Sequence, residues 1–228
     1  MIRIPFWKKW WSYISDVHLE SHESSINPSL HLVLAEGRLQ LCTDNSIYSF
    51  EDKYENFFKA FKTLHQQGVW SYTNILILGF GLGSIPKMLE DHFQLNLNYT
   101  AIEIDDVIID MASDYVLPHL KSSIQLIHAD ALSFMSQNEE RYDMICVDLF
   151  LDDIIPDQFK AKSFLTSIKK ALSDNGIVLY NMLGDYEKDK KIAKIYFKEH
   201  FKKVFPDASM MHTGTNFILA SDSVLPKN

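Results

Sequence analysis

The sequence predicts an α/β fold in which a mostly parallel seven-stranded sheet is covered by helices, ends in an antiparallel hairpin and follows a small β-rich region. From residue 74 onward, apolar segments of strand length alternate with segments of helical periodicity. Glycines follow the first of these strands, and acidic residues stand at the ends of the next three. Such strands run parallel, so their carboxyl ends meet at one edge, where ligands bind.

Length and charge narrow the classes of protein that fit. The 228 residues, 46% of them hydrophobic, suit one sizeable domain plus a small appendage. We expect a β-rich region over residues 1–50 and a main domain over residues 51–228. The net charge of −8 argues against a general nucleic-acid surface. With no apolar run of 18 residues and no signal-peptide pattern at the start, we expect a cytoplasmic protein without a membrane partner. A homodimer stays open.

The first 50 residues combine clustered aromatic residues with short alternating segments. Four aromatics fall within seven residues: Trp7, Trp10, Trp11 and Tyr13. They predict a short element that packs on the core or on a partner subunit, and a membrane-surface position is the alternative. Alternating polar and apolar residues then predict β-hairpins. The expected strands are 17–22, 30–34 and 38–43, with turns at 27–28 and 36–37.

The remaining elements follow from periodicity and from the residues that end each segment. The expected main-sheet strands are 74–78, 98–105, 124–130, 142–148, 177–182, 208–212 and 216–220. The expected helices are 51–67, one beginning near 85, 107–115, 131–137, 160–172 and 187–203. The short link 213–215 predicts an antiparallel hairpin at the sheet edge. We interpret Asn175-Gly176 as the end of the helix before it.

The most informative stretch is Asn74 to Ser84, which joins a buried strand to a helix through Gly79, Gly81 and Gly83. Glycine lets a backbone turn tightly and approach a ligand closely, and a helix N-terminus offers free N–H groups. Alone, these glycines also fit an ordinary turn. Together with Glu103, 20 residues after Gly83 and placed to accept ribose hydroxyls, they predict a nucleotide-type site.

The pattern resembles the Rossmann-like class I S-adenosylmethionine-dependent methyltransferase fold. Within that fold, the chain is similar to the spermidine synthase (polyamine aminopropyltransferase) family over roughly residues 30–219. Residues 32–40 are similar to that family's LDG-x-x-Q hairpin, and residues 48–54 are loosely similar to its Y-x-E segment. Residues 101–106 match its VEIDE strand. The resemblance implies a small β-domain in front of the catalytic domain.

The resemblance also implies roles for individual residues. The cofactor-binding residues would be the three glycines, Glu103 on the ribose, and Asp130 with Ala131 on the adenine amino group. Asp148 would be the catalytic base that accepts a proton from the attacking amine. The residues expected on the acceptor side are Gln40, Tyr48, Asp152 and Asp153.

Two positions depart from that family's pattern. Leu82 stands where its GGGDGG loop carries the acid that binds the aminopropyl ammonium, and Leu151 stands where its DSSDP segment carries a second acid. Because an unpaired buried ammonium is costly, our first hypothesis is methyl transfer from S-adenosylmethionine to a small molecule. The alternatives are aminopropyl transfer from decarboxylated S-adenosylmethionine, or non-catalytic binding of a nucleoside or a partner.

Neither metal binding nor disulfide formation is expected. His18 and His22 are four residues apart, but they lie in an extended segment without supporting ligands. Cys42 and Cys146 lie in apolar, strand-like segments, which is typical of buried reduced thiols.

Overall fold

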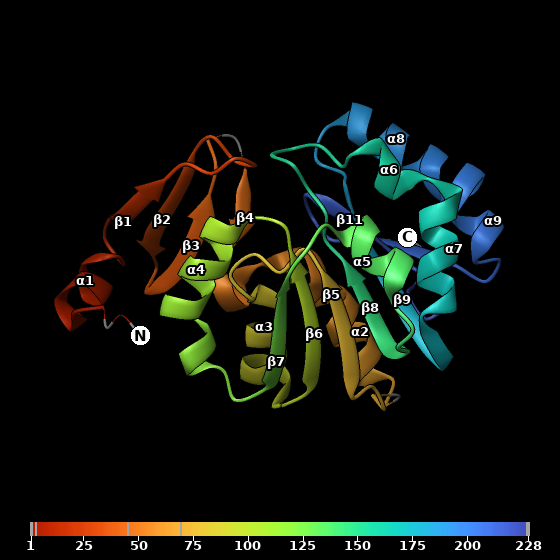
Figure 1. Ribbon diagram of the computed structural model, residues 1–228, viewed down its shortest axis with the longest axis horizontal. Helices are drawn as coiled ribbons and strands as arrows, with labels where there is room; N and C mark the ends of the chain where they lie inside the picture. Colours follow the sequence, from red (N-terminus) through yellow and green to blue (C-terminus); the bar gives the residue numbers. More distant parts are fainter. Residues whose placement is uncertain (1, 3, 45, 69, 227–228) are drawn as a thin grey trace.

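The fold, taken from a computed structural model that describes residues 2, 4–44, 46–68 and 70–226, contains two sheets. The first sheet has the order β1-β2-β3-β4 and the second the order β10-β11-β9-β8-β5-β6-β7 (Figure 1). The strands of the first sheet are β1 Val17–His22, β2 Leu30–Ala35, β3 Arg38–Cys42 and β4 Ile47–Ser49. Those of the second are β5 Asn74–Leu78, β6 Asn98–Glu103, β7 Ser123–His128, β8 Tyr142–Val147, β9 Leu172–Leu183, β10 Ser209–His212 and β11 Asn216–Ala220.

The helices lie before, between and after these strands. The α-helices are α1 Phe6–Trp11, α2 Glu55–Gln66, α3 Ser84–Phe93, α4 Asp106–Tyr115, α5 Ala131–Gln137, α6 Asp157–Lys160, α7 Lys162–Lys170, α8 Glu187–Tyr196 and α9 Lys202–Val204. Short 3-10 turns cover Glu51–Lys53 and Leu117–His119, and a π-helical turn covers Phe197–Phe201.

The seven-stranded sheet confirms the predicted fold class. β5 pairs in parallel with β6 and β8, and parallel pairing extends to β7 on one side and β9 on the other. β11 runs antiparallel to both β9 and β10, which makes the final hairpin. The strand order reverses at β5, and ligands bind at such a switch point in open α/β sheets.

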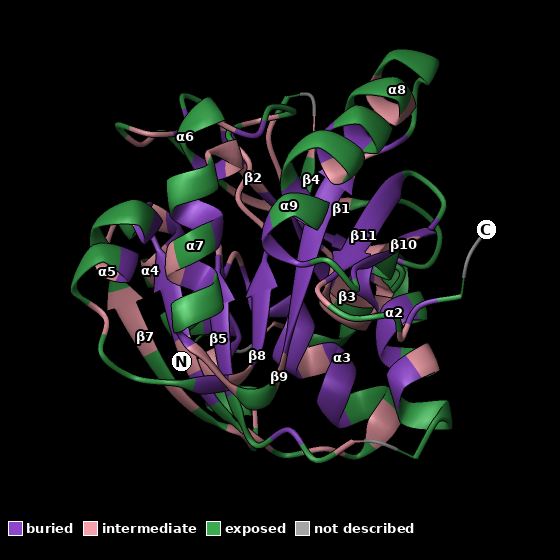
Figure 2. Ribbon diagram, turned by 90° about the vertical axis from the view of Figure 1, so that its right-hand side faces the viewer, coloured by how far each residue is buried: buried purple, intermediate pink, exposed green. Residues whose placement is uncertain are grey.

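Alternate residues of the central strands enter two apolar clusters, one on each face of the sheet. Ile75 and Ile77 pack in the cluster with α2, α3, α4 and the four-stranded sheet. Leu76 and Leu78 pack in the cluster with α5, α7 and α8. Figure 2 shows the buried central strands between more exposed helices. Burial on both faces explains why these strands are almost continuously apolar.

The predicted N-terminal hairpins are confirmed, and β4 adds a strand that the sequence did not indicate. Glu36 and Gly37 form the turn between β2 and β3 with φ values of 50° and 78°. Positive φ at both central residues gives a two-residue hairpin the twist of its strands. Leu30, Leu32 and Leu34 project into the core cluster shared with the main sheet. A division into domains at residues 50 and 51 stays a prediction.

Helix α1 does not pack on the core of this chain, so that interpretation of its aromatics was wrong. None of its residues is buried, and Phe6 is 83% exposed. A partner subunit or a membrane surface stays a prediction. Within the described ranges, no helix combines the length and the apolar character needed to cross a bilayer.

Several predicted boundaries differ, among them the helix expected at 51–67, which is broken at Tyr54 into a 3-10 turn and α2. The helix expected at 160–172 is interrupted at Ala161, whose ψ of 146° is extended. The last long helix passes through the π-helical turn at 197–201. Gly176 lies inside β9, where the register shifts between the pairs Tyr142–Leu172 and Met144–Ile177. An added Cβ there would lie 2.9 Å from the Tyr142 carbonyl oxygen.

The cysteines are free thiols, as predicted. Cys146 is buried and Cys42 is half-buried, and burial raises the pKa of both thiols. The described residues contain no cluster of three or more His, Cys, Asp or Glu side chains arranged to hold a metal. The expectation that no metal is needed stays a prediction.

Asp105 joins the loop between β1 and β2 to the start of α4. It is fully buried and caps α4 by accepting a hydrogen bond from the Val107 N–H at 3.0 Å. It also accepts from the Ser24 hydroxyl at 2.5 Å and from the Asn27 side-chain amide at 2.6 Å. The carboxylate therefore satisfies a helix end and the loop between β1 and β2 together.

We predict that Asp105→Ala lowers the free energy of unfolding by at least about 2 kcal/mol, because it removes a cap and leaves buried donors unpaired. Asp130→Ala is the control, since Asp130 also caps a helix, through the Ser133 N–H at 2.8 Å. The control should cost about 1 kcal/mol. Equal losses in urea titrations would show that Asp105 is only a cap.

Candidate functional site

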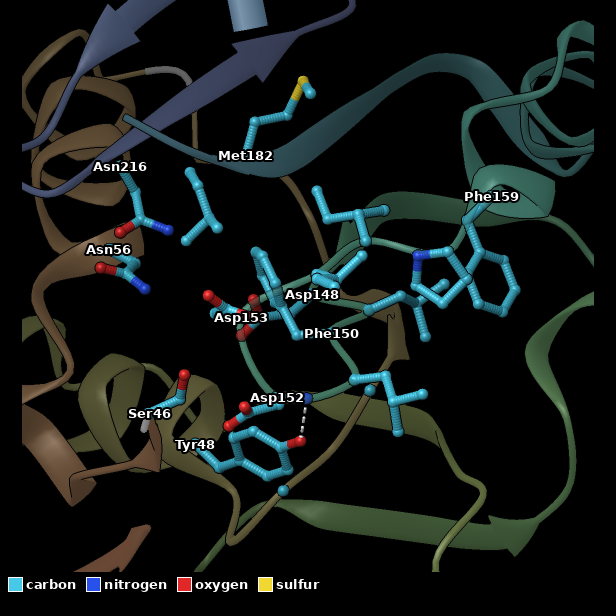
Figure 3. Close-up of a pocket in the computed structure, with 18 of the residues that line it drawn as sticks. Ser46, Tyr48, Asn56, Asp148, Phe150, Asp152, Asp153, Phe159, Met182 and Asn216 are labelled. Atoms are coloured by element: carbon cyan, nitrogen blue, oxygen red, sulfur yellow. Dashed lines mark hydrogen bonds between the residues drawn. The ribbon is translucent and has the colours of Figure 1, made fainter. Parts of the chain in front are cut away.

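A large cavity opens at the carboxyl edge of the parallel sheet, where the predicted ligand site lies. Its volume is about 1430 Å³. Its walls come from the ends of β5, β6 and β8, from β4 and from the segments around α6 and α8 (Figure 3). The four-stranded sheet therefore closes one side of a site that the main sheet builds.

Nine of the eleven predicted site residues line this cavity. They are Tyr48, Gly79, Gly81, Glu103, Asp130, Ala131, Asp148, Asp152 and Asp153. Gln40 and Gly83 are not among the described lining residues. Gln40 is buried in β3, and Gly83 precedes α3 with a φ of 72°. An added Cβ on Gly83 would lie 2.9 Å from the Phe80 ring, so this glycine serves the turn.

Glycine stands at the two lining positions for different structural reasons. Gly79 has a φ of 87°, and any Cβ at this position would collide with the backbone carbonyl of Asp148. Gly81 has a φ of 55° and donates its N–H to Glu103 at 2.9 Å. A Cβ on Gly81 would meet only ordinary contacts with Tyr48 and Ser49. Gly79 thus fixes the distance between β5 and β8, and Gly81 ties the loop to β6.

Glu103 is buried and orders the backbone around it. Besides the bond from Gly81, it accepts the N–H groups of Ile104 at 2.9 Å and Asp105 at 3.2 Å. Burial raises the pKa of its carboxyl group, and these three bonds oppose the shift. Because each carboxylate oxygen can accept more than one hydrogen bond, capacity for a ligand hydroxyl remains.

Asp148 follows β8 and is held by neutral donors. The Asn181 amide donates to it at 2.8 Å, and Asn216 in turn donates to the Asn181 side-chain oxygen at 2.9 Å. The Tyr54 hydroxyl forms a further hydrogen bond with Asp148. Burial raises the pKa of Asp148 to about 6, partly offset by these bonds, and the charge of Glu103 adds to the rise. Such a group exchanges protons near neutral pH.

Tyr54, Asn181 and Asn216 are site residues that the sequence analysis missed. Asn181 carried a usable signal, because it interrupts the apolar run 177–182 of a strand buried on both faces. A polar side chain in such a place needs a hydrogen-bond partner. Tyr54 falls within the helix expected at 51–67, whereas in the structure it precedes α2 with a ψ of 85°.

The loop after β8 is attached to the N-terminal sheet. Asp152 has a φ of 54° and donates its backbone N–H to the Tyr48 oxygen at 2.5 Å. The Thr43 hydroxyl donates to the Asp152 carboxylate at 2.6 Å, and the Tyr48 hydroxyl donates to Asn27 at 2.8 Å. Burial raises the pKa of Tyr48 to about 12. Asp153 is exposed and lines the same cavity as Asp148 (Figure 3).

The two leucines that replace the expected acids occupy different environments. Leu82 is 1% exposed in the core and is not among the described lining residues. Leu151 is 46% exposed and lines the cavity. An acid at position 82 would therefore be buried in apolar surroundings, whereas position 151 faces the space available to a ligand.

Acidic residues predominate among the charged side chains of the cavity. The described lining contains eight acids and three lysines. The acids are Glu55, Glu103, Asp130, Asp148, Asp152, Asp153, Asp185 and Asp189, and the lysines are Lys53, Lys160 and Lys188. Lys53 pairs with Glu36, and Lys160 pairs with Asp157 at 2.7 Å, both outside the lining. The cavity therefore attracts cations.

A family comparison identifies the chain. The profile described as "Spermine/spermidine synthase domain" matches residues 55–217. The chain belongs to this family. The match begins at α2 and reaches β11, so it covers the sheet and the cavity edge described above.

Two curated relatives of this spermine/spermidine synthase family member carry different names. A "Probable polyamine aminopropyl transferase" of Bifidobacterium longum is 31% identical over 107 residues, covering 47% of this chain and 23% of the relative. The "eEF1A lysine and N-terminal methyltransferase" of Bos taurus is 28% identical over 120 residues, covering 48% of this chain and 17% of the relative. The matched region covers 23% of the Bifidobacterium longum protein, 51% of a polyamine aminopropyltransferase of Vibrio vulnificus and 48% of one of Alkaliphilus metalliredigens, so this chain spans about half of these relatives or less.

A solved structure supports the family's fold in this chain. Spermidine synthase from Thermotoga maritima superposes with a TM-score of 0.67 at 17% identity, covering 90% of this chain and 72% of that one. The comparisons favour aminopropyl transfer over methyl transfer, which the sequence analysis placed first.

We predict that Gly79→Ala lowers the free energy of unfolding by more than about 2 kcal/mol, because it adds a backbone collision to an unfavourable φ. Gly68→Ala is the matched control. Gly68 has a φ of 67°, and among the described residues other than its chain neighbours no atom lies within 4 Å of its added Cβ. The control should cost only about 1 kcal/mol. Equal melting curves for the two variants would contradict the proposed contact.

Proposed function

We propose that this protein transfers the aminopropyl group of decarboxylated S-adenosylmethionine to an amine. The observation that carries the proposal is the excess of acids around a cavity with Asp148 at its base. The decarboxylated donor ends in an ammonium and lacks a carboxylate. An acidic cavity favours that donor over one with a carboxylate.

The nucleoside would bind at the ends of β5, β6 and β7. Glu103 would accept the ribose hydroxyls, and Asp130 with Ala131 would contact the adenine. Ile104 is 41% exposed and lines the same side, where it offers an apolar surface for the base. These assignments direct the sulfonium toward Asp148.

In the proposed reaction, the amine nitrogen attacks the aminopropyl carbon that is bonded to the sulfonium sulfur. The new C–N bond forms as the C–S bond breaks, and methylthioadenosine leaves with the bonding electron pair. Asp148 accepts a proton from the amine, so it must be ionised at the start of this step. Tyr54 and Asn181 orient its carboxylate through the hydrogen bonds described above.

Methyl transfer to an amine is the second candidate. Leu82 leaves the glycine loop without the acid that the resemblance assigns to the aminopropyl ammonium, and one relative is named as a lysine and N-terminal methyltransferase. The acceptor chemistry is shared, because an amine must lose a proton in both reactions. The two reactions differ in the tail of the donor, which carries a carboxylate in S-adenosylmethionine and lacks it in the decarboxylated form.

We predict that decarboxylated S-adenosylmethionine and methylthioadenosine raise the melting temperature more than S-adenosylmethionine and S-adenosylhomocysteine do. A ligand at 100 times its dissociation constant adds about 2.7 kcal/mol, or roughly 5–10 °C for a chain of this size. A larger shift with the carboxylated pair would assign methyl transfer. If none of the four ligands produced a shift, a nucleoside-dependent transferase would be contradicted.

We predict that Asp148→Asn lowers the transfer rate at least about 100-fold, because an amide cannot accept the proton. The wild-type rate should rise with pH through about 6, as Asp148 ionises.

The variant should not lose stability at pH 8. When folding raises the pKa of a carboxyl group, the free energy of unfolding falls as the pH rises through that raised pKa. For Asp148 the loss is up to about 3 kcal/mol.

Stability measured at two pH values is the control for this variant. At pH 3.5 the wild-type carboxyl is already neutral in the folded state, so any advantage of Asn should shrink there. A variant that is equally destabilised at both pH values and keeps full activity would make Asp148 a structural cap only.

A further inference from the structure

The four aromatic side chains of α1 lie on one arc of the helix and are exposed. Because successive residues of an α-helix are turned by about 100°, these four fall within about 140°. They are Phe6, Trp7, Trp10 and Trp11, which are between 52% and 83% exposed. We call these four residues the aromatic face. At about 150–250 Å² per side chain, the aromatic face exposes roughly 400–650 Å², and a patch of that size marks an interaction surface.

Two lysines border the aromatic face, one along each edge. The same rotation places Lys8 about 60° beyond Trp11 and Lys9 about 60° before Phe6. The Lys8 ammonium lies 5.9 Å from the centre of the Trp7 ring, and Lys9 is exposed. Lysines in such positions keep their ammonium groups in a polar layer while the neighbouring rings enter an apolar one.

The charge of this stretch is opposite to that of the whole chain. Residues 1–15 contain three basic residues and no acid, so all 30 acidic residues follow residue 15, and the net charge of the chain is −8. Asp16 is the first acid after α1, and Glu36, on the turn beside it, is paired with Lys53. The end of the molecule that carries α1 is therefore complementary to a negatively charged surface.

Polar contacts hold α1 in place without using the aromatic face. The buried Ser12 follows the helix, and its carbonyl oxygen accepts the Glu36 N–H at 2.9 Å. Its hydroxyl oxygen accepts the Gly37 N–H, also at 2.9 Å. On the other side of the helix, the Ile2 N–H donates to the Asp114 carbonyl oxygen at 3.1 Å. Figure 1 shows α1 projecting at the end of the molecule opposite α7 and α9.

We propose that the aromatic face and its two lysines bind the surface of a bilayer that contains anionic lipids. The rings would enter the boundary between head groups and acyl chains, and the ammonium groups of Lys8 and Lys9 would lie at the lipid phosphates. Tryptophan is enriched at this boundary, and three of the four tryptophans of the chain belong to the aromatic face.

A protein partner fits the aromatic face less well than a bilayer does. A stable protein interface buries roughly 800 Å² per partner, which exceeds the area of the aromatic face. In a twofold contact with a second copy, the same surface of both chains would meet, so the lysine pairs would repel each other. The bilayer proposal departs from the sequence expectation of no membrane partner. It is independent of the proposed function, because α1 is not among the described lining of the cavity.

Cosedimentation of the full chain with lipid vesicles tests the proposal. The probes are vesicles of phosphatidylcholine alone and vesicles in which about one lipid in three is phosphatidylserine. Binding to the anionic vesicles should be at least about tenfold tighter, because each lysine near an anionic surface contributes about fivefold. Salt at about 0.5 M should reduce this preference by screening the charges. Tryptophan emission should move to shorter wavelength as the rings leave water.

Two apolar substitutions form the first matched pair. Trp10→Ser should weaken binding to the anionic vesicles at least about tenfold, because a large ring no longer enters the bilayer. Ile195→Ser is the control, since Ile195 is 50% exposed on α8 and Trp10 is 60% exposed on α1. The control should leave vesicle binding unchanged. Both side chains are exposed, so both melting temperatures should match that of the wild type.

Two double charge reversals form the second matched pair. Lys8→Glu with Lys9→Glu should weaken binding to the anionic vesicles at least about tenfold. Lys191→Glu with Lys194→Glu changes the net charge equally on the lysine-rich α8, where both side chains are exposed. That control should weaken binding less than about threefold. A larger effect of the α8 reversals would place the charged contact on α8 and contradict the proposal.

Three further results would overturn the proposal. The first is that the wild-type chain binds neither kind of vesicle, and the second is that it binds both equally. The third is that Trp10→Ser and Ile195→Ser have equal effects in variants that melt like the wild type. Sedimentation velocity without lipid identifies the competing occupant. Self-association that Trp10→Ser abolishes, in a chain that does not bind vesicles, would assign the aromatic face to a second copy.

Discussion

The structure depends on holding two carboxylates, the buried Glu103 and the half-buried Asp148, at the edge of an apolar sheet. Neutral donors stabilise both: backbone N–H groups for Glu103, and amide and hydroxyl groups for Asp148. Neutral donors stabilise the charge less than a cation would, so burial raises the pKa of each group. The raised pKa of Asp148 lowers the free energy of unfolding above that pKa. In the proposed reaction, the same raised pKa would let Asp148 accept a proton near neutral pH.

The hydrogen bonds that hold these carboxylates also assemble the site. Glu103 ties the glycine loop to β6, and the Asn216–Asn181–Asp148 series ties β11 and β9 to the end of β8. From the other side, Tyr48 bridges the loop after β8 to Asn27, which bonds Asp105. The four-stranded sheet is thus a wall of the site as well as a neighbour of the core.

Much of the site could be predicted because parallel strands bring their carboxyl ends together. Gly79, Glu103 and Asp148 are far apart in sequence, and alternation alone places them at one edge. Partners that depend on tertiary packing could not be found this way. Asn216 acts through Asn181, and Tyr54 reaches Asp148 only because the chain bends before α2. The π-helical turn and the break before α7 likewise follow from packing that periodicity does not encode.

Leu82 shows why matching one position to a family pattern does not fix the electrostatics of a site. A missing acid in the glycine loop argued against a cationic donor tail, yet position 82 is buried in the core. The negative potential comes instead from acids on several other segments, including the loop after β8 and the segment around α8. Potential in a cleft is a sum over all its walls. Loss of one acid therefore changes the potential modestly, whereas the exposed Leu151 adds apolar surface to the cavity wall. In the proposed reaction, the choice of donor would therefore depend on the acids of all the cavity walls together.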